Sequence, residues 1–264
     1  MPSPDELLEV MIPAAREAGE AALALRAGGL TVEAKGDLSP VTRADRRAEA
    51  IIVSALTQAW PQIPIIAEEA CAAGIVPATK DGQFFLVDPI DGTREFIAGR
   101  DDFTVNIALV VEGFPVVGCV FVPATAEMFE GSPAGAFRQQ GSGAREPIFV
   151  RRHAGLLVAL ASRSHRTEAT NRFLGTLDLE RVDPVGSSLK FCRVAEGAAD
   201  VYPCFGPTME WDTAAGQAVL EAAGGQVVTA DSRERFAYGK TGRPDAPDFR
   251  NPSFIAIGGV SLPA

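Results

Sequence analysis

Five acidic side chains occur where predicted helices or strands begin or end: Asp45, Glu68, Asp88, Asp91 and Asp212. Glu68 and Asp88 follow short apolar segments typical of buried strands, and ligand sites of layered α/β proteins collect at strand ends. Carboxylate and carbonyl oxygens are hard ligands that suit Mg²⁺ or Mn²⁺. The chain contains two histidines, which disfavours a zinc site and a mechanism with a histidine nucleophile. These residue types therefore predict a site for a hard divalent cation.

The segment Asp88–Thr93 (Asp-Pro-Ile-Asp-Gly-Thr) has a spacing that suits metal-assisted phosphoryl chemistry. Pro89 fixes φ and permits a sharp turn that aims both carboxylates at one point, with the Ile90 carbonyl between them. Two metal ions held this way would clamp a phosphoryl group. Gly92 and Thr93 would offer backbone N–H groups to a phosphate at the start of a helical turn. The Thr93 hydroxyl would orient or help to deprotonate the attacking water.

Each of these residues also has an ordinary structural interpretation. A lone Asp-Pro-Ile-Asp-Gly run is typical of a plain turn, and Glu68 with its neighbour would form a solvated pair. Asp45 fits a capping box with Thr42, and Asp212 fits an N-cap for a helix that begins at the next residue. Their co-occurrence in one chain favours the metal site over these separate interpretations.

The charge balance sharpens this prediction. The 264-residue chain has a net charge of −10 and an isoelectric point near 4.8, so it would repel nucleic acids and anionic membranes. An acidic protein that handles phosphate needs metal ions or a local cationic cluster. Gly186, Ser187 and Ser188 would offer N–H and hydroxyl donors at a helix start, and Lys190 would counter a second phosphate. The alternative is a serine N-cap followed by a surface lysine.

Cysteines and termini indicate a reducing compartment. Four cysteines occur without a CxxC pair or a C-x5-R phosphatase loop, which favours buried reduced thiols: Cys71, Cys119, Cys192 and Cys204. The first residues lack the cationic region of a signal peptide. The longest apolar stretch, 103–122, is interrupted by polar residues, Gly and Pro, which indicates two strands around a turn. We therefore expect a cytoplasmic protein without an integral membrane segment.

The pattern of apolar residues predicts alternating helices and strands in a mixed, layered architecture. Helices are expected at 5–28, 42–60, 168–177, 187–196 and 213–223. Strands are expected at 63–67, 84–87, 104–111, 116–122, 128–130, 136–138, 156–161, 181–184, 199–202, 226–229 and 253–257. A soft boundary near the Gly-Ser-Gly run at 141–143 divides an N-terminal α+β half (1–145), with most metal ligands, from a C-terminal α/β half (146–264), with the substrate-binding elements and Asp212.

Three ordered motifs together resemble a known family. Glu68-Glu69, Asp88–Thr93 and Trp211–Gly216 (Trp-Asp-Thr-Ala-Ala-Gly) look like the signature of the lithium-sensitive, magnesium-dependent phosphatases. That superfamily contains the inositol monophosphatases, fructose-1,6-bisphosphatases and bisphosphate nucleotidases. The resemblance covers the chain from the first helix to Ile257 and implies an α/β (α+β layered) fold, a five-layer αβαβα sandwich.

The resemblance also implies roles for individual residues. The metal ligands would be Glu68, Asp88, the Ile90 carbonyl, Asp91 and Asp212, holding two or three Mg²⁺ ions for which Mn²⁺ can substitute. A weaker third ion would involve Glu68 and a water near Asp45. Thr93 with Asp45 would activate the water, so the catalytic set is Thr93, Asp45 and Glu68. Substrate contacts would come from Asp91, Gly92, Thr93, Gly186, Ser187, Ser188, Lys190 and Asp212.

A narrower resemblance suggests the substrate. The segments 186–192, 195–203, 205–208 and 251–256 are similar to those of the bacterial 3′(2′),5′-bisphosphate nucleotidases. These enzymes remove the 3′-phosphate of adenosine 3′,5′-bisphosphate, giving AMP, and are tied to sulfate assimilation. Two positions depart from the pattern. Ala70 replaces a frequent third acid, which leaves the ligands intact, and Lys240 lies in an extended loop that bears on the pocket wall.

Other functions remain open at this level. The same scaffold supports hydrolysis of inositol monophosphate or fructose 1,6-bisphosphate, and a metal- and phosphate-binding module without turnover is a third hypothesis. The expected partner is a small phosphorylated metabolite, a nucleotide bisphosphate, rather than a nucleic acid. The resemblance allows a monomer or homodimer and leaves open peripheral contact with the inner face of the cell membrane.

Overall fold

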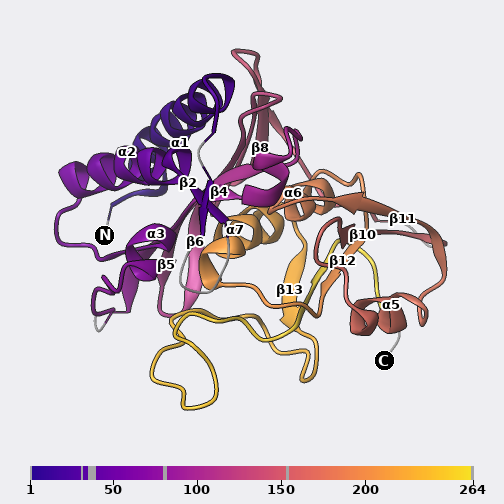
Figure 1. Cartoon of the computed structure of the whole chain (residues 1–264). Coiled ribbons are helices and arrows are strands. Elements are labelled where there is room, and N and C mark those ends of the chain that lie inside the picture. Colours follow the sequence, from indigo (N-terminus) through magenta and orange to yellow (C-terminus); the bar gives the residue numbers. More distant parts are fainter. Residues whose placement is uncertain (1, 31, 35–39, 80–81, 153–154, 263–264) are drawn as a thin grey trace.

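The computed structural model describes residues 2–30, 32–34, 40–79, 82–152 and 155–262 (Figure 1). Most of the loop expected at 35–40, and His153, lie outside these ranges. Helices α1 (Pro4–Ala27) and α2 (Arg43–Ala59) lie side by side and form the first layer (Figure 1). Capping boxes at Ser3 and Thr42 begin the two helices, as expected for Thr42 from the sequence.

The second layer is a seven-stranded sheet in which strand order follows the chain. Its strands are β3 (Ile65–Ala67), β4 (Gln83–Asp91), β5 (Thr104–Val111), β6 (Phe114–Val122), β7 (Glu127–Ser132), β8 (Gly135–Gln140) and β9 (Arg145–Pro147). β3 is parallel to β4, and all later pairs are antiparallel. The predicted hairpin of β5 and β6 is confirmed. An apolar core of α1, α2 and one face of this sheet joins the first two layers.

The third layer is a pair of short helices, α6 (Leu189–Ala195) and α7 (Ala214–Ala222), packed between two sheets. Helix α7 crosses β6 and β7 closely because glycines face it. A Cβ at Gly131 would lie 2.4 Å from the Ala218 carbonyl oxygen, and one at Gly118 would lie 2.8 Å from the Ala218 Cβ. The largest apolar core of the protein surrounds these helices.

A five-stranded sheet forms the fourth layer, in the order β11-β10-β12-β14-β13. The strands are β10 (Leu157–Ser162), β11 (Leu179–Val185), β12 (Val201–Cys204), β13 (Gln226–Thr229) and β14 (Phe254–Ile257). Helix α5 (Glu168–Leu174) buries Leu174 against the outer face of this sheet and is the fifth layer. Three apolar cores thus fill the four interfaces between the five layers, because the core around α6 and α7 extends to both sheets, and the predicted αβαβα sandwich is confirmed.

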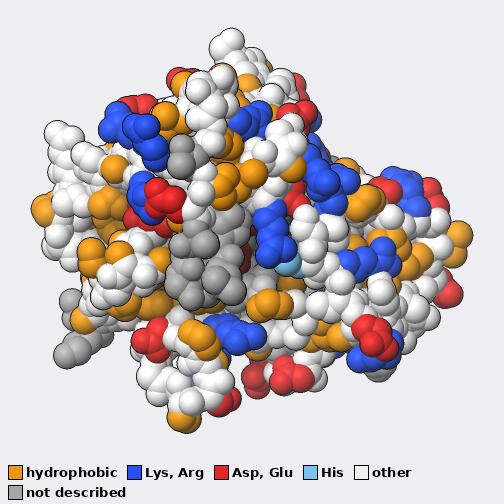
Figure 2. All heavy atoms as spheres, in the orientation of Figure 1, with side chains coloured by type: hydrophobic (Ala, Val, Ile, Leu, Met, Phe, Trp, Pro, Cys, Tyr) orange, Lys and Arg blue, Asp and Glu red, His pale blue; other side chains and the backbone are white. Residues whose placement is uncertain are grey.

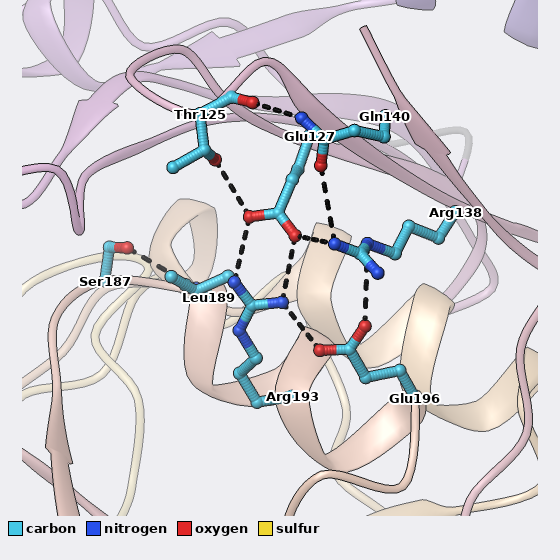
Figure 3. A network of polar contacts seen from close by, with 8 residues as sticks. All are labelled: Thr125, Glu127, Arg138, Gln140, Ser187, Leu189, Arg193 and Glu196. Atoms are coloured by element: carbon cyan, nitrogen blue, oxygen red, sulfur yellow. Dashed lines mark hydrogen bonds and ion pairs between the residues drawn. The ribbon is translucent and has the colours of Figure 1, made fainter. Parts of the chain in front are cut away.

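A buried ion-pair network joins α6 to the large sheet (Figure 3). Glu127 on β7 is 3% exposed and accepts from both terminal nitrogens of Arg193, at 3.1 and 2.9 Å, and from Arg138 at 2.5 Å. Glu196 pairs with the same two arginines. Two carboxylates and two guanidinium groups balance one another, so the network fixes the end of α6 without a net buried charge.

Several elements of three to five residues are too short to show a repeating apolar pattern, and of these only the helical turn of α4 was expected from the sequence. They are β1 (Val32–Ala34), β2 (Pro40–Thr42), β9, α3 (Glu68–Ala72), α4 (Thr93–Ile97) and the 3₁₀ turn η1 (Glu210–Asp212). Three of them, α3, α4 and η1, carry predicted site residues. Among the described residues, no helix combines the length and apolar character that a membrane crossing requires.

Candidate active site

A bulge at the end of β4 brings two of the predicted ligands together. The β4–β5 pairing runs to Asp88 opposite Asn106 and resumes only at Asp91 opposite Thr104. Pro89 has no N–H to give to the ladder, so the strand bends at this point. The Asp88 Oδ1 accepts the Ile90 N–H at 3.0 Å, which fixes the bend. The plain-turn interpretation of this segment is therefore wrong.

The chain turns from β4 into α4 at Gly92. Its φ of +89° is in the left-handed region, which only glycine adopts without cost. A Cβ here would also lie 3.4 Å from the Asp102 carbonyl oxygen, so the turn has little spare room. The helical turn expected after Gly92 is confirmed, and it begins at Thr93.

Thr93 links this turn to Asp45 on α2. Its hydroxyl lies 3.3 Å from the Asp45 Oδ1 and 3.1 Å from the Ile90 carbonyl oxygen. The other oxygen of Asp45 accepts both the N–H and the hydroxyl of Thr42, each at 2.7 Å. Asp45 is 1% exposed. One of its oxygens thus belongs to the capping box of α2, and the other is the partner of Thr93.

Glu68 is the first residue of α3, and a second glutamate holds that helix in place. Glu49 on α2 accepts the backbone N–H groups of Glu69 and Ala70, at 2.7 and 2.9 Å. It thereby caps the orphan donors of a five-residue helix. The supporting role of Glu49 was not predicted, although an acidic residue on the buried face of α2 could have indicated it.

Ser188 joins the two halves of the carboxylate cluster. Its N–H donates to the Asp91 Oδ2 at 2.6 Å, and its hydroxyl donates to the Asp212 carbonyl oxygen at 2.5 Å. The Asn106 side-chain amide donates to the same Asp91 oxygen at 3.3 Å and to the Ser188 hydroxyl at 3.0 Å. Asn106 was also missed, because only the β4–β5 register places it beside Asp91.

Two alternative interpretations are wrong in this region. Ser187 has a φ of +50° and Ser188 makes no capping bond, so α6 begins at Leu189 rather than at 187. Lys190 is 4% exposed rather than a surface lysine. Asp212 does not cap α7; its Oδ2 accepts the Met209 N–H at 2.8 Å within η1.

The Gly186 backbone is held against Asp102. Its N–H donates to the Asp102 Oδ2 at 2.7 Å, and Arg163 pairs with the same oxygen at 2.9 Å. A Cβ on Gly186 would lie 2.4 Å from the Asp102 carbonyl oxygen. The N–H groups of Gly186 and Ser188 were expected to face a phosphate, but both donate to carboxylates of the protein. Their carboxylate partners shape the wall instead.

The clustered carboxylates perturb one another. Burial, followed by repulsion from Glu68, Asp91 and Asp212, raises the pKa of Asp88 well above its usual value. Burial and the Asp91 charge do the same to the pKa of Asp212. Burial raises the pKa of Asp91 as well, although the Lys190 ammonium opposes this rise. Crowded anions of this kind favour a cation among them.

The chemistry of the donors therefore fits a hard divalent cation. Within the described part of the chain, no three acidic, histidine or cysteine side chains form a ready-made metal site. Asp88 is instead hydrogen-bonded to Glu68 and Asp212. A cation bound among these carboxylates would relieve their mutual repulsion.

All but two of the predicted residues line one pocket of about 300 Å³. Asp45 and Ser188 do not line this pocket but contact the lining residues Thr93 and Asp91. Acidic side chains are visible in the central hollow, and cationic side chains stand on its rim (Figure 2). The pocket also contains residues that sequence analysis did not single out, notably Arg94, Glu95, Ser162, His165, Tyr202, Cys204 and Thr208.

Three basic side chains border the pocket above the carboxylates: Arg94, His165 and Lys190. The Lys190 ammonium donates to the Ser187 carbonyl at 2.6 Å and lies 4.9 Å from the Tyr202 ring centre. Burial lowers the pKa of Lys190, while Asp91 raises it. Burial and the Arg94 charge lower the pKa of His165. Arg94 and Lys190 thus place two cations at this pocket although the whole chain is acidic, and the lowered pKa favours the neutral form of His165.

The cysteines play no part in the carboxylate cluster. All four are free thiols, and Cys119, Cys192 and Cys204 are buried as predicted. Cys71 is partly exposed, because the short helix α3 leaves it at the edge of the core. Burial raises the pKa of Cys119 to about 12, which keeps that thiol protonated.

Comparisons with known proteins agree with this fold. The model of the inositol monophosphatase family matches residues 3–252. This chain therefore belongs to the inositol monophosphatase family. It is 42% identical over 223 residues to the 3′(2′),5′-bisphosphate nucleotidase CysQ of Salmonella typhimurium, covering 84% of this chain and 89% of the relative. CysQ of Escherichia coli K12 is 41% identical with the same coverage.

Solved structures show the same architecture. CysQ of Bacteroides thetaiotaomicron superposes with a TM-score of 0.80 at 34% identity, covering 97% of this chain and 98% of that one. An inositol monophosphatase of Thermotoga maritima gives a TM-score of 0.78 at 28% identity, over 96% and 92% of the two chains. The family predicted from three sequence motifs is confirmed.

Proposed function

We propose that this protein is a magnesium-dependent phosphomonoester hydrolase that removes the 3′-phosphate of adenosine 3′,5′-bisphosphate, giving AMP and phosphate. The observation that carries the proposal is a pocket with a carboxylate floor and a cationic rim. The similarity to the CysQ nucleotidases supports the nucleotide substrate. We further propose a link to sulfate assimilation, a cytoplasmic location and a monomeric or homodimeric state.

Glu68, Asp88, Asp91, Asp212 and the Ile90 carbonyl would hold two or three Mg²⁺ ions, or Mn²⁺ in their place. Bound there, the ions supply Lewis-acid stabilisation of the phosphoryl oxygens and a lowered pKa for the attacking water. The protein itself supplies the arrangement of oxygens. Ser188 contributes by fixing Asp91 with its N–H and the Asp212 backbone with its hydroxyl.

Thr93 and Asp45 would handle the proton of the water. When the Thr93 hydroxyl donates to the Asp45 Oδ1, its oxygen lone pairs are free to accept a hydrogen bond from water. The water proton would pass through the hydroxyl to Asp45, whose other oxygen is fixed by Thr42. Glu68 lines the same floor and would orient the water from the opposite side.

The rim would bind the second phosphate of the substrate. Arg94 lies on the exposed surface at the mouth of the pocket, one residue after the proposed catalytic threonine. The acidic floor repels an anion that carries no metal, so a second phosphate would settle among Arg94, His165 and Lys190. A charge-assisted hydrogen bond there contributes about 1.5–3 kcal/mol, or roughly a 10- to 100-fold gain in affinity.

The test compares adenosine 3′,5′-bisphosphate with adenosine 3′-monophosphate, which lacks the second phosphate. Arg94→Ala should raise KM for the bisphosphate about 10-fold or more and leave KM for the monophosphate unchanged. Arg47→Ala, which removes an exposed arginine from α2 outside the pocket, is the matched control and should change neither. Equal KM values for both nucleotides in the wild type would refute the second-phosphate site. No phosphate release from either would favour a non-catalytic module.

A further inference from the structure

The residue two positions before Asp212 is a completely buried carboxylate for which the proposed reaction has no use. Glu210 begins η1 and has an exposure of 0%. A buried anion destabilises a fold unless partners compensate it. The three-residue turn that it begins is too short to maintain its own geometry, since it contains a single 3₁₀ turn. Tertiary contacts must therefore hold Asp212 in place.

Glu210 receives its partners from a distant segment. Its two carboxylate oxygens accept the N–H groups of Gly239 and Lys240, at 2.7 and 2.9 Å. The Lys240 ammonium pairs with the same carboxylate at 2.8 Å. This ammonium also lies 4.9 Å from the Phe236 ring centre and 5.0 Å from that of Tyr238. The buried negative charge is thus matched by one cation and two backbone donors.

The other end of the same loop holds η1 from a second side. The Glu210 N–H donates to the Phe249 carbonyl at 2.8 Å. The Asn251 side-chain amide donates to the Met209 carbonyl at 2.6 Å and to the Thr213 hydroxyl oxygen at 3.0 Å. These contacts flank Asp212 on both sides in the sequence.

The loop between these contacts is closed at its base. The Phe249 N–H donates to the Lys240 carbonyl at 2.7 Å, so residues 240 and 249 are paired. Residues 241–248 are largely exposed and form the part of the loop that projects from the body of the protein, coloured toward yellow (Figure 1). The closed base therefore separates a buried clamp, residues 238–240 and 249–251, from a projecting arc.

We propose that Glu210 is a positioning residue that fixes the Asp212 carboxylate through this clamp. The inference rests on the proposed role of Asp212 as a metal ligand. Removing the Glu210 charge releases Gly239 and Lys240 from η1 and lets the turn carry Asp212 away from Asp88 and Asp91. Groups that orient metal ligands typically contribute a factor of 10 to 100 to metal affinity. Lys240, a departure from the nucleotidase pattern, thereby gains a structural role rather than a substrate contact.

The test measures Mg²⁺ binding to the free protein by titration calorimetry, without substrate. Glu210→Gln should weaken Mg²⁺ binding about 10-fold or more. Without metal, it should also speed hydrogen–deuterium exchange of the peptide that contains residues 209–213. Glu180→Gln is the matched control: it weakens an exposed glutamate–arginine pair with Arg181 on β11, in the same half of the protein and outside the clamp. It should leave both readouts unchanged.

Two further variants distinguish loss of the clamp from misfolding of the Glu210→Gln variant. Lys240→Gln keeps both backbone donors to Glu210 and should weaken Mg²⁺ binding less than Glu210→Gln does. Replacing the arc 242–248 with two glycines keeps the closed base and should not alter Mg²⁺ binding. Unchanged Mg²⁺ affinity in both Glu210→Gln and Lys240→Gln, or a large loss on removal of the arc, would overturn the clamp. A wild type that binds no Mg²⁺ would instead overturn the proposed function and the clamp together.

Discussion

Neutralising Asp212 should stabilise the metal-free protein while it abolishes catalysis. Asp212→Asn keeps an oxygen that can accept the Met209 N–H, now 2.8 Å from the Asp212 Oδ2. The new amide group would face Asp88, which is hydrogen-bonded to Asp212. Because the substitution removes repulsion from Asp91 and Glu68, it relieves strain that the wild type can relieve only by binding a cation or a proton.

The size of this effect depends on pH, and its sign follows from the raised pKa. The folded protein binds a proton at Asp212 more tightly than the unfolded chain does. Wild-type stability is therefore greatest near the ordinary aspartate pKa and falls as pH rises toward the raised value. Each pH unit in that window costs up to about 1.4 kcal/mol for this one group. The advantage of the variant over the wild type therefore grows as pH rises from the ordinary aspartate pKa toward the raised one.

Thermal unfolding without metal, followed by circular dichroism at pH 5 and pH 7, measures this gain. The variant should unfold at a higher temperature than the wild type at pH 7, by about 2–4 °C for each kcal/mol gained in a chain of this size. At pH 5 the two should differ less. Added Mg²⁺ should raise the wild-type Tm and leave the variant nearly unchanged. A variant that is less stable than the metal-free wild type at pH 7 would refute the electrostatic reasoning.

Three further substitutions test separate parts of the site. Thr93→Val removes the hydroxyl between Asp45 and the pocket, so kcat should fall about 100-fold or more while calorimetry finds Mg²⁺ binding unchanged; a kcat within threefold of the wild type would exclude the proton path. Gly186→Ala places a Cβ 2.4 Å from the Asp102 carbonyl oxygen, so Tm should fall. An unchanged Tm would show that the backbone at Asp102 can move away without loss of stability. Arg193→Met leaves the 3%-exposed Glu127 with Arg138 as its remaining cation (Figure 3). The free energy of unfolding in urea should fall by about 1–3 kcal/mol, and KM is the second readout. No loss of stability would show that the ion-pair network does not stabilise the fold.

The longer helices and strands could be predicted because their signals are local, whereas the five-layer arrangement followed from the family resemblance. The capping box of Thr42 and Asp45 begins α2, and the apolar runs of β5 and β6 surround a Glu-Gly turn. The carboxylates could be predicted as a group because each stands at the end of such an element. Their grouping then needed only the general tendency of ligand sites to gather at strand ends.

The supporting contacts could not be predicted because they depend on tertiary register. Glu49 reaches α3 across 20 positions, and Asn106 meets Ser188 across 82. The sequence identifies Lys240 only as a loop residue, and its contact with Glu210 depends on the tertiary fold. Ser187 carries no signal for a φ of +50°, so the predicted helix at 187–196 began too early. Short elements such as η1 derive their geometry from partners, and a local pattern says little about them.

The central claim is that the carboxylate floor and cationic rim together form a magnesium-dependent site for a nucleotide bisphosphate. Its most direct test is phosphate release from adenosine 3′,5′-bisphosphate, inositol 1-phosphate and fructose 1,6-bisphosphate, each with Mg²⁺ and with a chelator. We predict the highest kcat/KM for the adenosine bisphosphate, with activity lost in the chelator. A higher kcat/KM for either of the other substrates, or undiminished turnover in the chelator, would contradict the account.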